Sequence, residues 1–385
     1  MKITHVVPAL TKGGGERVAM DLANHAADCG HEVTILTAVP SDSVAPVERR
    51  PGVELRYIYP RGRSRIGRYA SLPTWLVRNR RWLAEQDIVH CHMTFASVTG
   101  TLVQLARTVF RQDRPAVIET CHSVGAPIPR LHQRLYAFLA APKDGVALIA
   151  EDVSWTGLRR RRGDRPVAII RNGVAFAPQI ERRGSGVANY RRRVGIPDSC
   201  DIVVGTVGRI AADRRPSLYI PVIADIAAAI GPNVHFIMGG AGPEFENMQA
   251  AVREVGLGDR VHFPGLVLDP VLAMSAMDLY LTMNIGAVTG IAAIEAAAAG
   301  TPVVAIQMAP DRERQDDDWI WSSSDPRAVA AHAIGLLRSG EQRLALAQQQ
   351  QAYARSHHGV DAMARAYYEL YDRIRVKESG NVAAE

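Results

Sequence analysis

A repeating unit between residues 201 and 305 constrains the fold of this 385-residue chain more than any other feature. Three apolar runs, at residues 202–207, 234–238 and 278–283, each lead into glycines and then into a segment of helix length. Short apolar runs that alternate with helices predict a parallel sheet covered on both faces. Ligands of such sheets bind beyond the carboxyl ends of the strands, and the glycines and charged residues of this stretch follow those ends.

A single carboxylate, Glu295, stands in the otherwise apolar helical segment between Gly290 and Gly300. Leaving an ionised carboxylate buried and unpaired costs several kcal/mol, so a buried Glu295 is expected to be paired or to bind a ligand. The alternative is that Glu295 faces water on the outer side of its helix.

Five short motifs follow one another in this part of the chain. They begin at Val207, Gly240, Arg260, Met277 and Gly290. In order and spacing they closely resemble the nucleotide-sugar domain of the family-four retaining glycosyltransferases, and the resemblance covers nearly the whole chain. It implies an α/β fold of the GT-B type, in which two Rossmann-like parallel-sheet domains face each other across a cleft and a C-terminal helix crosses back to the N-terminal domain. It also implies an enzyme, a hexosyl- or related transferase.

The chain length and the hydrophobic content of 47% suffice for two domains. We expect an N-terminal Rossmann-like acceptor-side domain over residues 1–180 and a nucleotide-sugar-binding domain over residues 198–356. The composition shifts to Arg, Gly, Ser and Asn at residues 178–197, which predicts a linker. Residues of about 358–377 resemble the crossing helix, and a disordered tail is expected at residues 378–385.

The four cysteines, Cys29, Cys91, Cys121 and Cys200, lie far apart and show no paired spacing. This usage is typical of a reducing compartment and offers no metal cage. The first residues run straight into a strand without a signal peptide, and no apolar run approaches the roughly 18 residues that span a bilayer. We therefore expect a cytoplasmic protein, with peripheral attachment to the inner face of the cell membrane as an additional hypothesis.

Positive charge is concentrated in the first half of the chain. Residues 1–183 hold 27 Lys and Arg against 16 Asp and Glu, a net charge of +11, so the remainder carries −5 to reach the total of +6. The densest parts are residues 61–68, residues 75–82, which include two tryptophans, and residues 159–162. Arginines and tryptophans on one helix suit an anionic membrane surface, where each basic residue contributes about 1 kcal/mol. The alternative is a solvated face, and nucleic acid is not an expected partner because no binding module accompanies the charge.

A glycine-rich loop follows the first predicted strand. Glycines between a strand and a helix let a ligand approach the backbone and its amide donors. A dinucleotide fingerprint requires a third glycine where this chain has Val18, which argues against an NAD enzyme. The resemblance implies that Lys12 and Gly13 lie on the acceptor side of the cleft and that Gly14 and Gly15 lie near the donor phosphates. A tight turn without a ligand is the alternative.

Two predicted strands of the first half lead into histidines. The seven strands expected there are at residues 3–8, 31–38, 53–59, 87–92, 116–121, 146–150 and 167–170. His92 ends the fourth strand and His122 follows the fifth, at the same edge of a parallel sheet, where imidazoles are usable donors near neutral pH. The resemblance implies that His122 contacts the transferred sugar and that His92 takes a more variable cleft position on the acceptor side. Without the resemblance, a structural role is the more common one for either histidine.

A departing nucleoside diphosphate requires positive charge at the site, because negative charge grows on the leaving oxygen in the transition state. Arg209 and Arg214 follow a strand end, and guanidinium groups suit phosphate oxygens. By resemblance they match the family's arginine and lysine pair, with arginine in place of the usual lysine, and have a catalytic and donor-binding role. Arg215 is interpreted as a surface residue.

The donor site departs from the family pattern at one position. The resemblance matches Glu295 to the glutamate that holds the ribose hydroxyls, but Ala287 replaces the glutamate that normally binds the donor sugar. Three interpretations stay open: the donor sugar is unusual, Asn284 or Thr289 substitutes, or the enzyme is impaired. The other expected donor contacts are Gly242, the backbone around Leu266, and the amides of Thr289, Gly290 and Ile291 at a helix start.

The mechanism implied by the resemblance is a same-face, retaining transfer in which a phosphate oxygen of the leaving group takes the acceptor proton. Ala287 is compatible with it, because no carboxylate nucleophile is then present at that position. The run from Asp316 to Asp318 contains an Asp-x-Asp pattern that binds a divalent metal in glycosyltransferases of another fold. Here it is expected in a connecting segment, so we expect no metal and no other cofactor.

The leading functional hypothesis is transfer of a sugar from a nucleoside diphosphate sugar to a lipid-linked or membrane-surface acceptor, in the biosynthesis of surface polysaccharide, lipopolysaccharide or glycolipid. The basic first domain favours this acceptor class. One alternative is transfer to a soluble metabolite or natural product. A second, motivated by Ala287, is a sugar-nucleotide-binding protein with impaired catalysis.

Overall fold

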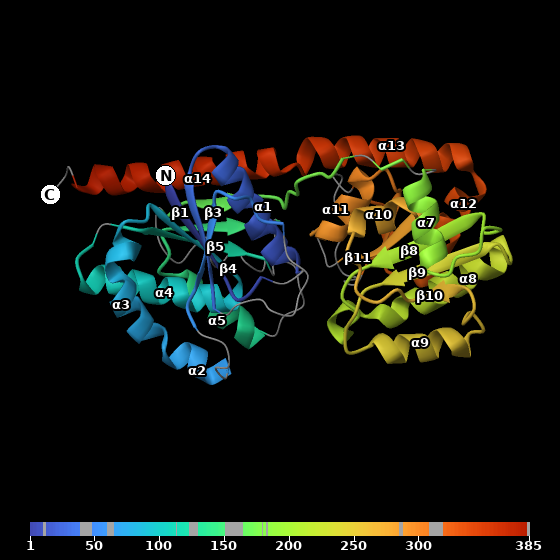
Figure 1. Ribbon diagram of the computed structural model, residues 1–385, viewed down its shortest axis with the longest axis horizontal. Helices are drawn as coiled ribbons and strands as arrows, with labels where there is room; N and C mark the ends of the chain where they lie inside the picture. The colour runs from blue at the N-terminus through green and yellow to red at the C-terminus, as the bar shows by residue number, and fades with distance from the viewer. Residues whose placement is uncertain are drawn as a thin grey trace. The chain divides into compact units, whose positions relative to one another are not determined.

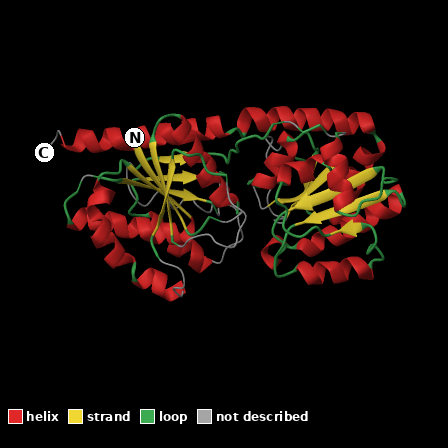
Figure 2. Cartoon of the chain, in the orientation of Figure 1, coloured by secondary structure: helices red, strands yellow, loops and turns green. Residues whose placement is uncertain are grey.

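The computed structural model describes residues 1–10, 13–38, 48–59, 65–112, 114–122, 130–150, 165–178, 180–181, 184–284, 288–307 and 319–382. The chain divides into two compact units (Figure 1). The first consists of Met1–Ala175 together with Gly359–Glu385, and the second is Phe176–His358. Each unit holds a sheet with helices packed around it (Figure 2). No helix within the described ranges is both long and apolar enough to span a bilayer.

The first unit is built on a parallel sheet, with seven strands in the described residues. They are β1 (Lys2–Val7), β2 (Glu32–Thr37), β3 (Val53–Tyr57), β4 (Ile88–His92), β5 (Ala116–Cys121), β6 (Gly145–Leu148) and β7 (Val167–Ile169). Their order in the sheet is β3-β2-β1-β4-β5-β6-β7, and each neighbouring pair is parallel. The predicted strands are confirmed to within two residues at each end.

Helices cover both faces of this sheet. One face carries α1 (Gly14–Asp28) and α14 (Val360–Val382), which pack together, and the other carries α3 (Leu72–Ala84), α4 (Met93–Val109) and α5 (Arg130–Ala140), with α2 (Arg65–Ala70) preceding α3. Two consecutive residues of β4 show the division, since consecutive side chains of a strand point to opposite faces. His90 bonds Tyr371 of α14, whereas Cys91 lies against Gly100 of α4.

The second unit repeats the architecture around a sheet with six strands in the described residues. They are β8 (Ile202–Val207), β9 (Val234–Gly239), β10 (Val261–His262), β11 (Leu279–Asn284), β12 (Val303–Gln307) and β13 (Ser322–Ser323), in the order β10-β9-β8-β11-β12-β13. The helices are α7 (Ser185–Arg193), α8 (Tyr219–Ile230), α9 (Phe245–Glu254), α10 (Pro270–Ser275), α11 (Ile291–Ala298), α12 (Pro326–Arg338) and α13 (Gly340–His357). The strand order reverses between β8 and β11, and such a switch point is where ligands bind in doubly wound sheets.

The segment predicted as a linker, residues 178–197, contains α7 and belongs to the second unit. Val187 and Tyr190 are buried against α10. Arg191 donates to the carbonyl oxygen of Ala276 at 2.9 Å. The linker prediction is therefore wrong here, because two apolar residues one turn apart suffice to dock a short helix that is otherwise Arg- and Gly-rich.

The C-terminal helix α14 extends through Val382. The prediction of a disordered tail is therefore wrong for residues 378–382, and residues 383–385 lie outside the described part of the chain. Extending an existing helix by a turn adds one hydrogen bond per residue without a new nucleation cost, so a polar sequence without proline continues the helix.

The tryptophans of the basic stretch face the protein interior. Trp75 and Trp82 are seven residues apart on α3, pack edge to face with ring centroids 6.2 Å apart, and contact the apolar core of the first unit. Arg56 lies over the Trp82 ring at 4.5 Å. Arg78 and Arg81, in contrast, are exposed. The apolar core of the first unit thus engages both tryptophans of this helix, whereas the arginines reach solvent. Attachment to an anionic membrane surface through this helix stays a prediction.

Candidate active site

The loops after β8, β9 and β10 are held together by backbone contacts that glycines permit. Gly240 donates its amide to the carbonyl oxygen of Gly265 at 2.8 Å. A Cβ atom on Gly240 would lie 1.8 Å from the carbonyl oxygen of Gly208, and one on Gly242 would lie 2.1 Å from that of Ile210. Any side chain at these two positions would separate the loops. The predicted donor residue Gly242 thus lies in a close-packed edge beyond the carboxyl ends of the strands.

Arg209 and Arg214 lie beside the same carboxylate, that of Asp213. The Nη2 atom of Arg209 is 2.5 Å from Asp213 Oδ2, and the Nε atom of Arg214 is 3.9 Å from the same oxygen. The three side chains are about half exposed, so these ion pairs are screened and contribute little to stability. Two guanidinium groups around one anionic oxygen are an arrangement to which a diphosphate can bind in place of the carboxylate.

The turn that carries these arginines is strained at Arg215. This residue links the 3-10 helices Ala212–Arg214 and Pro216–Leu218 in a left-handed conformation, with φ 42° and ψ 53°. For a residue with a side chain this conformation costs about 1–2 kcal/mol. Arg215 is exposed, as predicted for a surface residue. The strained turn fixes where the backbone of Arg214 lies.

The helix α11 begins at the predicted donor residues. Gly290 is its N-cap, with φ −67° and ψ 147°, and Ile291 is its first residue. Thr289, just before the N-cap, is partly exposed and Gly290 is exposed. The first amides of a helix have no partner within the helix and lie at the positive end of its dipole, so this end suits an anionic group.

Glu295 is half-buried, one turn into α11. Helical side chains lean toward the N-terminus of their helix, which directs this carboxylate toward the end where Gly290 lies. Burial raises the pKa of Tyr280 on β11, and the charge of Glu295 adds a smaller increase. The Tyr280 hydroxyl donates to the carbonyl oxygen of Val207 at 2.8 Å and so joins β11 to β8. Glu295 therefore lies near the switch point of the sheet and not on a fully solvated outer face.

In the first unit, α1 begins at the glycine-rich loop. Gly13 is the N-cap, with φ −77° and ψ 156°. A Cβ atom on Gly13 would lie 2.2 Å from Oε2 of Glu16, and one on Gly15 would lie 3.2 Å from Sδ of Met93. The Glu16 carboxylate thus folds back over the first turn, in the manner of a capping box. The helix start that Gly14 opens is closely packed by Glu16 and Met93.

His92 and His122 meet at the carboxyl ends of β4 and β5. His92 Nδ1 is 3.0 Å from His122 Nε2, and His92 Nε2 is 3.2 Å from His5 Nδ1. His122 is partly exposed, whereas His92 is fully buried. Other histidines lie against both ring nitrogens of His92, and its place on the acceptor side of the cleft stays a prediction. Burial lowers the pKa of His122 to about 4, so its ring is neutral at pH 7.

Some predicted positions lie outside the described residues: Lys12, Ala287 and the run from Asp316 to Asp318. The backbone of Asn284 ends β11, and its side chain is not described. Leu266 is 51% exposed in the loop after β10, and the preceding Gly265 adopts a φ of 71°. The described donor candidates in this unit, which are Arg209, Arg214, Gly242, Leu266, Thr289, Gly290, Ile291 and Glu295, all follow carboxyl ends of β8 to β11.

Two protein-family models match this chain. The model described as Glycosyltransferase Family 4 matches residues 12–177, and the one described as Glycosyl transferases group 1 matches residues 201–339. The chain belongs to the family 4 glycosyltransferases. The predicted enzyme class, a glycosyltransferase, is confirmed by this membership.

Several relatives of this glycosyltransferase are named for 2-deoxystreptamine or for D-inositol 3-phosphate. The chain is 36% identical to the 2-deoxystreptamine glucosyltransferase of Streptomyces kanamyceticus over 129 residues, and so spans about a third of that relative. It is 27% identical to the 2-deoxystreptamine N-acetyl-D-glucosaminyltransferase of Streptomyces fradiae, over 76% of this chain and 74% of the relative. It is 26% identical to the D-inositol 3-phosphate glycosyltransferase of Mycobacterium marinum, over 87% of this chain and 76% of the relative.

A solved structure confirms the fold of this glycosyltransferase. HepE from Anabaena, whose crystal structure contains UDP and glucose, matches with a TM-score of 0.73 and 18% sequence identity, over 97% of this chain and 100% of HepE. The two parallel-sheet units are therefore those of the GT-B fold, as predicted.

Three residues of this glycosyltransferase site were not predicted from its sequence: His5, His90 and Asp213. His90 and His92 are two apart on one strand, a spacing that places both on the same face and signals a histidine cluster. His5 stands alone in an apolar run, and only the pairing of β1 with β4 brings it to the others. Asp213 lies directly before Arg214 and four residues after Arg209, so an ion pair could have been predicted from the order of charges in the sequence.

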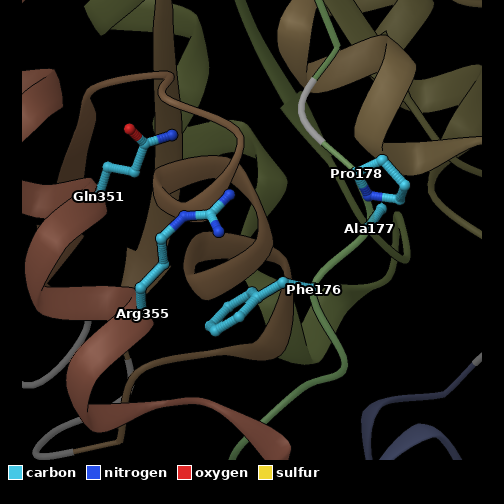
Figure 3. A pocket seen from close by; sticks show the side chains of 5 residues that line it. All are labelled: Phe176, Ala177, Pro178, Gln351 and Arg355. Atoms are coloured by element: carbon cyan, nitrogen blue, oxygen red, sulfur yellow. The ribbon is translucent and has the colours of Figure 1, made fainter.

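A hollow of about 610 Å³ lies in the second unit (Figure 3). It is lined by Phe176, Ala177, Pro178, Gln351 and Arg355. Gln351 donates to the carbonyl oxygen of Ala298, the last residue of α11, at 2.9 Å. Arg355 lies over the Phe176 ring at 5.5 Å. Gln351 and Arg355 thus satisfy the last carbonyl group of α11, at the end of the helix opposite to its N-cap Gly290.

Proposed function

We propose that the protein moves a sugar from a nucleoside diphosphate sugar to a hydroxyl group of a small, polyhydroxylated, soluble acceptor, with retention of configuration. The observation that carries the donor part is the convergence of Arg209 and Arg214 on one carboxylate, at the edge where β8 and β11 end. The acceptor class is supported by the relatives that are named for 2-deoxystreptamine and inositol 3-phosphate. This replaces the lipid-linked acceptor that the charge of the first half favours.

Each donor group has a proposed partner. The diphosphate takes the place of Asp213 between Arg209 and Arg214, and the first amides of α11 bind another phosphate oxygen. Glu295 accepts hydrogen bonds from the ribose hydroxyls. The backbone around Leu266 contacts the base. No metal is required in this arrangement, because two guanidinium groups and a helix N-terminus supply the positive charge.

In the chemical step, the bond between the anomeric carbon and the leaving phosphate oxygen breaks, and its electron pair stays on the diphosphate. Arg209 and Arg214 stabilise that charge as it grows. The acceptor hydroxyl adds to the anomeric carbon from the same face, and its proton passes to a phosphate oxygen. His122 contacts the transferred sugar and is neutral at pH 7, because burial lowers its pKa to about 4. A neutral imidazole suits a hydroxyl partner.

The test is a thermal-shift and calorimetric screen of UDP, GDP, ADP and their sugars against the wild type and Glu295→Ala. A nucleotide at 100 times its dissociation constant should add about 2.7 kcal/mol of stability, and Glu295→Ala should lose this gain. Glu254→Ala, at an exposed glutamate of the same unit, is the matched control and should keep it. Absence of binding by any nucleotide would refute the donor site.

The transfer itself is tested with the donor that binds, offered to 2-deoxystreptamine, myo-inositol and inositol phosphates. Anomeric proton couplings of donor and product then report the stereochemical outcome, and an inverted product refutes retention. Donor binding without transfer to any acceptor, together with recovery of transfer in Ala287→Glu, would favour the impaired-enzyme interpretation.

A lipid-linked acceptor is the second candidate, and α5 is the observation that favours it. Leu131, Leu135 and Phe138 are 77%, 48% and 69% exposed. Their spacing of four and three residues places them on one helix face, and Arg134 beside them is exposed. Such a helix suits the interface of an anionic bilayer. Vesicles of phosphatidylglycerol should then sediment the wild type but not the double variant Leu131→Ser, Phe138→Ser. If neither protein sediments with the vesicles, this candidate is removed.

A further inference from the structure

Three imidazoles form a hydrogen-bonded row across the first sheet, which we call the histidine row: His5, His92 and His122. His5 Nδ1 is 3.2 Å from His92 Nε2, and His92 Nδ1 is 3.0 Å from His122 Nε2. His5 and His92 are 1% and 0% exposed, whereas His122 is partly exposed. The row therefore leads from the core of the first unit to the one member that a ligand can reach.

The strand register explains why the row exists. In the parallel pairing, His5 lies opposite His90 on β4, and His92 lies opposite Thr120 on β5. Paired residues share a face of the sheet, and so do residues two apart on one strand. His5, His92 and His122 consequently lie on the same face, which α14 covers. The strands β1 and β4 each supply one member, and the third, His122, directly follows β5.

We propose that His92 and His5 are positioning residues that fix the ring orientation and the tautomer of His122. The inference rests on the proposed function, in which His122 contacts the transferred sugar. Neither His92 nor His5 reaches a substrate, since both are buried. Their effect passes through the two hydrogen bonds of the histidine row.

The hydrogen bonds of the row couple the three tautomers, because a neutral imidazole has one N–H and one lone pair. If His5 Nδ1 donates, His92 must carry its proton on Nδ1 and His122 must carry its proton on Nδ1 as well. If His122 Nε2 donates instead, the protons of His122 and His92 are both on Nε2, and His5 Nδ1 accepts. These two arrangements are the self-consistent ones, and each assigns Nδ1 of His122 one role, as donor or as acceptor.

The row is uncharged near neutral pH. Burial lowers the pKa of His5 to about 3 and that of His122 to about 4, and burial and the neighbouring imidazoles lower the pKa of His92. His90 of β4 packs against His92, and Tyr367 and Tyr371 of α14 pack against His90. These are neutral too, since burial lowers the pKa of His90 and raises those of both tyrosines.

His90 belongs to a separate network. Its Nδ1 is 2.7 Å from the Tyr371 hydroxyl and its Nε2 is 2.6 Å from Oγ1 of Thr120. The ring nitrogens of His5, His90 and His92 are close enough together to hold a metal ion. Both nitrogens of His90 bond hydroxyl groups, however, so the cluster is better accounted for by hydrogen bonding than by metal ligation.

The first experiment reads the tautomers without any substrate. Long-range proton–nitrogen correlation spectra of protein labelled with ¹⁵N-histidine distinguish Nδ1–H, Nε2–H and imidazolium, and His122→Phe assigns the His122 signals. We expect one neutral tautomer of His122 in the wild type between pH 5 and 8, and a mixture of both tautomers in His5→Leu. The matched control is His235→Phe, which removes an imidazole from a pair of the second unit, His235 and His262, with a nitrogen separation of 3.0 Å. It should leave the His122 signals unchanged.

The second experiment measures transfer kinetics. His92→Phe should lower kcat about 10- to 100-fold with the donor KM within about threefold, because misplacement of a contact group acts on the transition state. His5→Leu should lower kcat about 3- to 10-fold. His5→Asn should recover most of the loss, since the side-chain amide can bond His92 from the position of Nδ1. In a His122→Phe background, His5→Leu should change kcat by less than about twofold, because a residue that acts through His122 has no effect without it.

Three results would overturn the inference. The first is an unchanged, single tautomer of His122 in folded His5→Leu. The second is wild-type kcat in folded His92→Phe. The third is an additive loss in the double variant, which would mark His5 as a general packing residue. A wild type that transfers no sugar refutes the proposed function instead, and the spectra then still decide whether the row fixes the His122 tautomer.

Discussion

The free energy of unfolding of the wild type should fall as the pH rises from 5 to 8, and Glu119→Gln should lack this fall. Glu119 lies on β5 with 0% exposure, on the sheet face that packs against α4. The hydroxyl of Ser97 lies beside the carboxyl, yet neither carboxyl oxygen is in hydrogen-bonding geometry with any described residue. Lys143 supplies a positive charge nearby, but its ammonium group donates to the carbonyl oxygen of Ser97 and to Oγ1 of Thr101, both at 2.8 Å.

Burial raises the pKa of Glu119 from 4.5 to about 8, against the opposing effects of Lys143 and Ser97. The folded state therefore holds a proton that the unfolded chain has already released between these two pH values. Stability falls with rising pH wherever the folded state binds more protons. The contribution is fully present below pH 4.5 and is lost as the pH rises through 8. Between pH 5 and pH 8 the loss amounts to roughly 3–4 kcal/mol, at 1.36 kcal/mol per pH unit.

Glutamine has nearly the same shape and does not ionise, so Glu119→Gln should lack this pH-dependent loss. Its extra N–H groups cost about 1–3 kcal/mol if they find no partner, but that cost is the same at each pH. The quantity to compare is therefore the change in unfolding free energy between pH 5 and pH 8, from urea titrations followed by fluorescence and circular dichroism. Glu85→Gln, the same substitution at an exposed glutamate of the same unit, should reproduce the wild-type slope. Equal slopes in wild type and Glu119→Gln would refute the reasoning.

Four further predictions concern the second unit. Arg215→Gly should stabilise the protein by about 0.5–1 kcal/mol in thermal unfolding, because glycine accepts the left-handed conformation at φ 42° without strain; a lower melting temperature would contradict this. Gly242→Ala should abolish nucleotide binding in calorimetry, since its Cβ would lie 2.1 Å from a carbonyl oxygen, and wild-type affinity would show that the loops move apart easily. Asp213→Asn should tighten the binding of a free nucleoside diphosphate about 3- to 10-fold by removing a competing carboxylate, and weaker binding would mean that Asp213 orients Arg209. Glu295→Gln should weaken the same binding about 10- to 100-fold through loss of a charged hydrogen-bond acceptor, whereas an unchanged dissociation constant would place the ribose elsewhere.

Local patterns were sufficient for most of the architecture. Runs of mainly apolar residues such as 202–207 located the strands, because a strand buried on both faces presents few polar positions. The glycines at 240 and 242 were expected beyond a strand end, and the structure shows which carbonyl oxygens would meet a side chain there. The linker prediction failed at α7 because two buried residues, Val187 and Tyr190, give too weak a periodic signal in an Arg-rich segment.

The sequence by itself determined the strands, the glycine-rich turns and the arginines at a strand end, all of which are contiguous in the chain. Tertiary structure alone decided which distant side chains meet. The histidine row needs the parallel register of β1, β4 and β5, which brings together side chains 87 and 30 positions apart in the chain. The roles of His92 and Trp75 depended on burial, which the composition of a segment does not report. Burial is set by the packing of elements far apart in sequence. This packing encloses His92 within the histidine row and leaves His122 as the member that a ligand can reach.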